Sequence, residues 1–185
     1  TAGVTTVFDS LSLSGQKNGL DRGEALTVMM RGMDEAEDAN ALRIDHLLHL
    51  RCEVTNPEIE ALVSPYLGTK RLKMLSVMDH TPGGNRQSGS LEAWKQKMLK
   101  RGRTIEEIEA NLQASMSWRD LDGADARRRL IAEFGRDHNI PVASHDDATA
   151  DHIETAVGLG CQIAEFPVSY EAAETAKANN MITVM

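Results

Sequence analysis

The sequence alternates between short apolar, β-branched runs and longer amphipathic segments, and no two-residue turn joins one run directly to the next. Strands that alternate with helices in this way predict a parallel sheet, because a parallel connection needs a crossover, which is usually a helix. The chain is therefore expected to have an α/β fold. The runs that we expect as strands are 4–9, 44–54, 72–78, 140–145, 161–166 and 181–185.

The run 44–54 favours one α/β architecture over the other. Its apolar and polar side chains alternate, and successive positions of a strand point to opposite faces of the sheet. A doubly wound, flavodoxin-like sheet is apolar throughout because helices cover both faces, whereas a barrel can carry polar side chains on its inner face. The pattern therefore favours a (β/α)8 TIM barrel. The apolar positions are Leu48, Leu50, Cys52 and Val54, and the polar ones are His49, Arg51 and Glu53.

The length of the chain predicts an incomplete barrel. A complete barrel has eight strands and needs roughly 200 residues or more, whereas six strands are expected in these 185 residues. The chain also begins at Thr1 in a strand-like run and ends in the strand-like run 181–185. We expect residues 1–185 to form a single domain, the central part of a longer barrel protein that lacks its first and last strands.

Charge and cysteine content narrow the classes of function. The net charge is -8, and no cluster of Lys and Arg offsets it in a way typical of nucleic-acid binding. An anionic substrate would need a locally basic pocket. No apolar run approaches the length of a membrane span. Cys52 and Cys161 lack metal-ligand spacing and are expected to be buried free thiols, which favours a reducing, cytoplasmic location.

Polar side chains gather at the ends of the expected strands, where parallel α/β folds build their active sites. Two histidines and a carboxylate from different strands are a ligand set for Zn²⁺ or Mn²⁺, and such an ion makes hydroxide available at neutral pH. Each residue also has a structural alternative, such as a Glu53–Arg51 ion pair, an Asp79 cap or a His145–Asp147 hydrogen bond. The residues concerned are Asp9, Glu53, Asp79, His80, His145, Asp146 and Glu165.

The segment 81–89 is too rich in Gly and Pro for regular structure. Its glycines would let backbone N–H groups approach a ligand, and Arg86 could bind a phosphate with two hydrogen bonds. The alternative is an active-site loop without a phosphate role. The charged run 95–109 is expected to be a solvated helical face or a lid. His46 is not expected to bind metal, because it faces the opposite side of its strand from His49. His138 and His152 lie near helix ends and are not expected to bind metal either.

Four motifs resemble the phosphonate-metabolism branch of the amidohydrolase superfamily. They are 46–54, 78–83 with Arg86 and Gln87, 143–147 and 164–167. The resemblance implies a metal-dependent hydrolase on a (β/α)8 barrel, in which metal-activated water attacks the triphosphate of a small phosphorylated substrate and releases diphosphate. It also implies roles for individual residues: metal binding by Glu53, His80 and His145, catalysis by Asp79 and Asp146, and substrate binding by Arg51, Arg86 and Gln87.

The sequence departs from that family pattern in two ways. It contains no His-x-His, and no strand with the late Asp ligand follows residue 185. At most three metal ligands remain, so residues 1–185 alone are expected to have little hydrolase activity. The open sheet edges of an incomplete barrel favour self-association, so we expect a homo-oligomer. Two alternatives stay open: hydrolysis of an amide or cyclic amide at the same metal site, and a binding module without catalysis.

Overall fold

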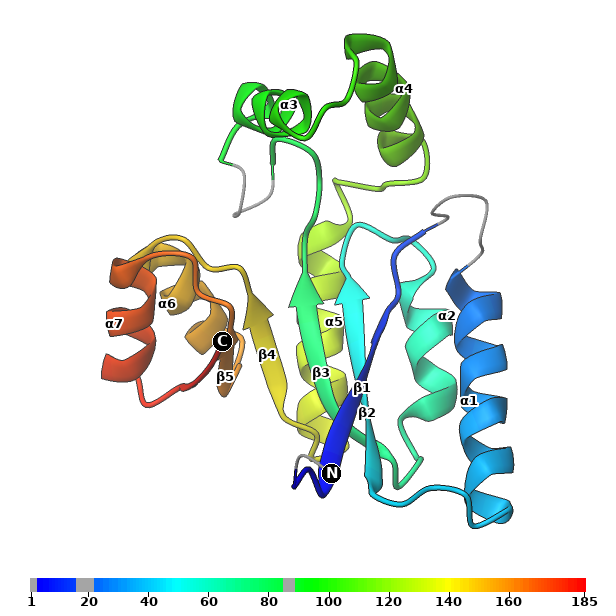
Figure 1. The fold of residues 1–185 in the computed structure, drawn as a ribbon. Helices are drawn as coiled ribbons and strands as arrows, with labels where there is room; N and C mark the ends of the chain where they lie inside the picture. The colour runs from blue at the N-terminus through cyan, green and yellow to red at the C-terminus, as the bar shows by residue number, and fades with distance from the viewer. Residues whose placement is uncertain (1–2, 16–21, 85–88) are drawn as a thin grey trace.

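A computed structural model describes residues 3–15, 22–84 and 89–185, and it contains one sheet of six parallel strands (Figure 1). The strands lie side by side in their sequence order, whereas a doubly wound sheet reverses its order at a switch point. The sheet curls into part of a barrel, which confirms the predicted α/β architecture (Figure 1). The strands are β1 (Thr6–Ser12), β2 (Asp45–Glu53), β3 (Leu72–Met78), β4 (Val142–His145), β5 (Ile163–Glu165) and β6 (Ile182–Val184). Barrels of this kind carry many activities, so the fold alone does not identify a family.

The helices form one layer on the convex face of the sheet, except for two that project beyond the carboxyl ends of the strands (Figure 1). The projecting pair is α3 (Leu91–Lys100) and α4 (Ile105–Met116). Within the described part of the chain, no helix has both the length and the apolar character needed to cross a membrane. The covering elements are α1 (Arg22–Asp38), α2 (Ile59–Val63) with the 3-10 turn η1 (Ser64–Tyr66), α5 (Ala124–Asp137), α6 (Ala150–Gly158) and α7 (Tyr170–Ala178).

The side-chain alternation predicted for β2 is confirmed. Its apolar positions, Leu48 to Val54, are fully buried and belong to the core between the sheet and the helix layer. The opposite, concave face carries His49, Arg51 and Glu53. It also carries a small apolar cluster of Met74, Ala143 and Ile163. The sheet therefore separates an outer hydrophobic core from an inner face on which polar groups are concentrated.

The first strand differs from the prediction. We expected a strand over 4–9, but β1 runs from Thr6 to Ser12. Leu11 is buried in the core, as is Leu13 just after the strand, so the Ser-Leu-Ser-Leu stretch alternates with the period of a strand. The serine and glycine content of this region concealed that pattern. As a result Asp9 lies in the middle of β1 and not at its end.

Four helix-to-strand turns share one backbone geometry, and the sequence analysis did not find this repeat. In each turn a residue with positive φ follows the helix, and the next N–H donates to the carbonyl oxygen five residues back. The last two units also repeat in sequence: Glu154-Thr155-Ala156 recurs as Glu174-Thr175-Ala176. The four bonds are Ala41 to Ala36 (2.9 Å), Ile140 to Gly135 (2.8 Å), Cys161 to Ala156 (3.0 Å) and Met181 to Ala176 (2.9 Å).

Gly135 allows α5 to approach β4 closely, which gives a stability prediction. A Cβ atom at Gly135 would lie 2.2 Å from Val142 Cγ2 and 2.8 Å from the Ile140 carbonyl oxygen. We expect Gly135→Ala to lower the free energy of unfolding by about 1–3 kcal/mol. The control is Gly158→Ala in α6, where a Cβ atom meets nothing within 4 Å. This substitution is expected to be neutral or stabilising by up to about 1 kcal/mol. Urea denaturation of both variants measures the difference, and equal stabilities would contradict the predicted contact.

Candidate metal centre

A cavity of about 410 Å³ lies at the carboxyl ends of the strands. Arg51 reaches it from β2, His80 from the segment after β3, and His145 from the end of β4. Phe166 follows β5 and packs edge-on against His145, with 5.8 Å between ring centroids. Side chains that are far apart in the sequence therefore meet at the end of the sheet where the sequence analysis placed the chemistry.

His145 is held by a carboxylate on the neighbouring strand. Glu165 is its register partner on β5, so both side chains lie on the same face of the sheet. Nδ1 of His145 lies 2.8 Å from Glu165 Oε2 and must carry the proton, because the carboxylate can only accept. Burial alone would raise the pKa of Glu165, but the hydrogen bond from His145 and the nearby charge of Arg51 hold it below its usual value. His145 is thus oriented with Nε2 toward the cavity.

A second carboxylate holds His80 in the same manner. Nδ1 of His80 lies 2.8 Å from Glu53 Oε2, and the backbone N–H of His80 donates to Glu53 Oε1 over 2.8 Å. The ring and the backbone of His80 are therefore both fixed, and its Nε2 points toward the cavity. The two imidazoles face each other edge-on, with centroids 5.2 Å apart.

Asp146 completes a cluster of three ligand-type side chains. It has a φ of 54°, and its N–H donates to the Glu165 carbonyl oxygen over 3.0 Å. Asp146 Oδ2 lies 3.6 Å from His145 Nε2 and 4.0 Å from His80 Nε2. The ligand atoms of the three residues lie within 4.8 Å of one another. Two imidazole nitrogens and one carboxylate oxygen fit a borderline ion such as Zn²⁺ or Mn²⁺, so the donor set is suitable for a divalent cation.

Glu53, expected from the family resemblance to be a metal ligand, is engaged in hydrogen bonds on both oxygens. Besides His80, its Oε1 accepts from Arg119 Nη1 over 2.8 Å and from Thr55 Oγ1 over 3.2 Å. Burial would raise the pKa of Glu53, but the His80 hydrogen bond and the Arg119 charge outweigh it and keep the pKa low. Glu53 is not part of the three-residue cluster, and its role as a direct ligand stays a prediction.

Arg119 is a site residue that the sequence analysis missed. It comes from the connection between α4 and α5 and lies 66 positions after Glu53. Its guanidinium is buried, donates to Thr55 Oγ1 and to the His80 carbonyl oxygen, and lies 4.3 Å from the centroid of the Trp118 ring. No local sequence pattern indicates this contact, because it depends on how the projecting helices return to the sheet.

His49 lies deeper on the inner face, beneath the cavity. Its Nδ1 and Nε2 form hydrogen bonds of 2.9 Å with Ser10 Oγ and Ser76 Oγ, which lie on the two neighbouring strands. Burial lowers the pKa of His49 to about 4, assisted by the charge of Arg51 and opposed by that of Glu165. His49 is therefore a neutral link between three strands at neutral pH.

The other expected residues have different surroundings. Asp79 Oδ1 accepts the Thr81 N–H over 2.9 Å, which is the capping alternative considered from the sequence, and its catalytic role stays a prediction. Asp9 bonds His46 over 2.9 Å and lies outside the cluster. Arg86 and Gln87, expected to bind substrate, lie outside the described residues. Cys52 and Cys161 are both buried, as predicted.

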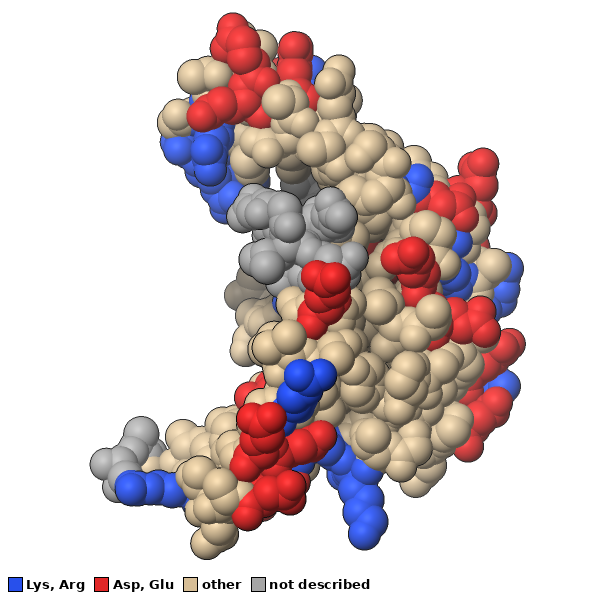
Figure 2. Space-filling model, turned by 90° about the vertical axis from the view of Figure 1, so that its right-hand side faces the viewer, with Lys and Arg blue, Asp and Glu red and all other residues tan. Residues whose placement is uncertain are grey.

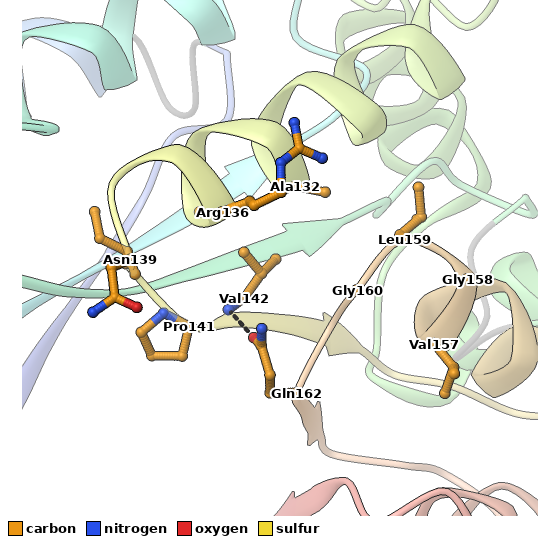
Figure 3. A pocket seen from close by; sticks show the side chains of 12 residues that line it. Ala132, Arg136, Asn139, Pro141, Val142, Val157, Gly158, Leu159, Gly160 and Gln162 are labelled. Atoms are coloured by element: carbon orange, nitrogen blue, oxygen red, sulfur yellow. Dashed lines mark hydrogen bonds between the residues drawn. The ribbon is translucent and has the colours of Figure 1, made fainter.

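A larger cavity, of about 660 Å³, lies at the opposite end of the sheet, between α5 and α6 (Figure 3). Its lining includes the loop residues Asn139 and Gly160 and the Gln162 side chain, which accepts a hydrogen bond from the Val142 N–H. Arg136 is the one charged side chain in that lining. This cavity has no group suited to acid–base or metal chemistry, so we place the candidate site at the carboxyl ends of the strands.

The chain is similar in sequence to a known diphosphatase. No protein-family model matches the chain. Over its whole length the chain is 32% identical, across 189 residues, to alpha-D-ribose 1-methylphosphonate 5-triphosphate diphosphatase of Escherichia coli K12. This match confirms the part of the motif resemblance that points to an enzyme of phosphonate metabolism. The chain spans 48% of that diphosphatase, or about half of its length.

The buried Arg119–Glu53 pair gives a second stability prediction. Arg119→Met would leave the Glu53 carboxylate buried without its cation, and we expect a loss of about 3–5 kcal/mol in unfolding free energy. The control is Arg136→Met, because Arg136 pairs with Asp137 at an exposed position. That variant is expected to change stability by no more than about 0.5 kcal/mol. Equal chemical denaturation curves for the two variants would show that the pair does not hold the site together.

The low pKa of His49 gives a prediction about pH. Between its ordinary pKa of 6.5 and its folded value of about 4, the unfolded chain binds a proton at His49 that the folded chain does not. The free energy of unfolding should therefore fall as the pH is lowered from 6.5 to 4, with a contribution from His49 of about 3 kcal/mol. His49→Gln keeps hydrogen-bonding groups but cannot titrate. Denaturation at several pH values should show a shallower decline for this variant than for the wild type; parallel declines would refute the assignment.

Proposed function

We propose that the chain carries part of the active site of a metal-dependent hydrolase of the amidohydrolase superfamily, which cleaves the triphosphate of ribose 1-methylphosphonate 5-triphosphate and releases diphosphate. The observation that carries this proposal is that His80, His145 and Asp146 each offer one ligand atom within 4.8 Å of the other two. The name of the similar diphosphatase supplies the substrate and the reaction.

His80, His145 and Asp146 would hold the cation, for which Zn²⁺ is the first candidate and Mn²⁺ the second. When bound, such an ion lowers the pKa of a water molecule toward neutrality and polarises a phosphoryl oxygen. Glu53 and Glu165 act through the two histidines: each carboxylate fixes one ring so that its Nε2 faces the cation position. Carboxylate–imidazole pairs of this kind are the usual support of histidine ligands.

The distribution of charge supports an anionic substrate. The chain has a net charge of -8, so a triphosphate needs basic groups close to the site. Arg51 provides one in the cavity. The projecting pair α3–α4, which overhangs the body of the molecule, carries further Lys and Arg side chains together with acidic ones (Figure 2). The basic residues of this segment are Lys95, Lys97, Lys100, Arg101 and Arg103. Arg86 and Gln87 would add to them if the family pattern holds.

The proposal is tested by zinc binding and by diphosphate release in the full-length gene product. We expect His145→Asn to lose bound Zn²⁺ and to release no diphosphate from ribose 1-methylphosphonate 5-triphosphate. Glu165→Gln should weaken Zn²⁺ binding by about 10–100-fold, because the His145 ring loses its support. His138→Asn is the control, since His138 caps the end of α5 away from the cavity.

Two results would contradict the proposal. The first is full Zn²⁺ binding in the His145→Asn protein, which would remove the cluster as the metal site. The second is turnover of amide or cyclic amide substrates with no diphosphate release from the sugar triphosphate, which would assign the same metal site to amide hydrolysis.

A further inference from the structure

Arg51 is hydrogen-bonded to the nitrogen atom of His145 that would also bind a metal ion. Its side chain lies on the inner face of β2, and Nη2 donates a hydrogen bond of 3.0 Å to Nε2 of His145. An arginine can only donate, so Nε2 accepts with its single lone pair. That lone pair is also the one that His145 would offer to a cation.

His145 has no second nitrogen available for the exchange. Its Nδ1 carries the proton that is donated to Glu165 Oε2 over 2.8 Å. Turning the ring would break this bond and would leave the Glu165 carboxylate, which is 6% exposed, without its donor. A cation can therefore bind His145 only if Arg51 releases Nε2.

Arg51 also has bonding capacity that the protein does not use. Its Nε is buried and has no hydrogen-bond partner among the described residues. Together with Nη2, the side chain would present two parallel N–H groups after it leaves His145. This is the arrangement that binds phosphate or phosphonate oxygens with two hydrogen bonds. The guanidinium lines the same cavity as His80, His145 and Asp146, so an anion bound to it would lie beside the cation.

We propose that Arg51 couples metal binding to anion binding in this site. While Arg51 is bonded to His145, a metal ion must displace this charge-assisted hydrogen bond, and it is also repelled by the positive charge of the guanidinium. When an anion binds Arg51, it holds the guanidinium away from Nε2 and offsets the repulsion between the two cationic groups. Each ligand then strengthens the binding of the other by the same factor, as linkage requires. The inference rests on the metal site of the proposed function.

Zinc affinity with and without an anion tests the coupling. Zn²⁺ binding to the full-length gene product is measured by competition with a chromophoric chelator, with methylphosphonate as the anion, because it binds free Zn²⁺ weakly. Arg51→Met removes both the donor and the charge, and we expect it to bind Zn²⁺ about tenfold more tightly than the wild type when no anion is present. Methylphosphonate should tighten Zn²⁺ binding several-fold in the wild type and have little effect in Arg51→Met.

Controls separate the coupling from a general charge effect or a failure to fold. Arg136→Met removes an exposed arginine at the opposite end of the sheet and should behave like the wild type in both measurements. If circular dichroism shows that Arg51→Met is unfolded, Arg51→Lys replaces it. Lysine keeps the charge but lacks the second parallel N–H group, so the effect of methylphosphonate should fall to less than half.

The outcomes distinguish this inference from the proposed function. The coupling is wrong, and the metal site stands, if the wild type binds Zn²⁺ and the Arg51 variant binds it no more tightly. The same conclusion follows if methylphosphonate raises the Zn²⁺ affinity of both proteins equally. If neither protein binds Zn²⁺, both the metal site and the coupling are wrong.

Discussion

The buried carboxylate of Glu53 organises the carboxyl end of this sheet. A carboxylate that is 1% exposed is costly unless its oxygens are hydrogen-bonded and its charge is matched. Here the donors come from three places: the residues just after β2, the segment after β3, and the connection that returns from α4 to α5. One charge at the end of one strand therefore fixes the position of His80, and it also anchors the base of the projecting helices through Arg119.

Each histidine of the cluster is oriented by a carboxylate bonded to its Nδ1, but the two carboxylates are brought into place in different ways. His145 and Glu165 are neighbours by strand register, so the sheet itself brings the imidazole and the carboxylate together. His80 follows β3 in a non-regular segment, where two bonds to Glu53 fix its ring and its N–H and Arg119 donates to its carbonyl oxygen. Regular structure thus positions one histidine and a buried ion network positions the other. In both cases Nδ1 carries the proton and Nε2 faces the shared cavity, which is one of the two arrangements in which a neutral imidazole can bind a metal.

The sequence was a good guide where local patterns decide the structure, and a poor one where distant contacts do. The alternation along β2 predicted the burial of Leu50 and the inward direction of Glu53, and β3 has the predicted bounds 72–78. Strand-end position predicted that His80, His145 and Asp146 would lie near one another, although Asp146 was expected to act in catalysis and Glu53 was expected to be the third metal ligand. Arg119 could not be predicted, because its place depends on the path of two helices. The repeat in the last two units was missed because it lies mainly in shared backbone geometry and in few identical residues.

Glu53 has two possible roles in the proposed site: it can orient His80, and it can bind the metal directly. A carboxylate has about four lone-pair directions, and Glu53 already accepts from the His80 ring, the His80 N–H, Arg119 and Thr55. These donors are unevenly divided, because three of them share Oε1 and only the His80 ring is bonded to Oε2, so Oε2 keeps an unused lone-pair direction. If a metal took the place of the His80 Nδ1 bond, that ring would be free to rotate, so the site would gain one ligand and weaken another. The observed hydrogen bonds therefore support a role of Glu53 in orienting His80, and direct metal binding by Glu53 stays a prediction.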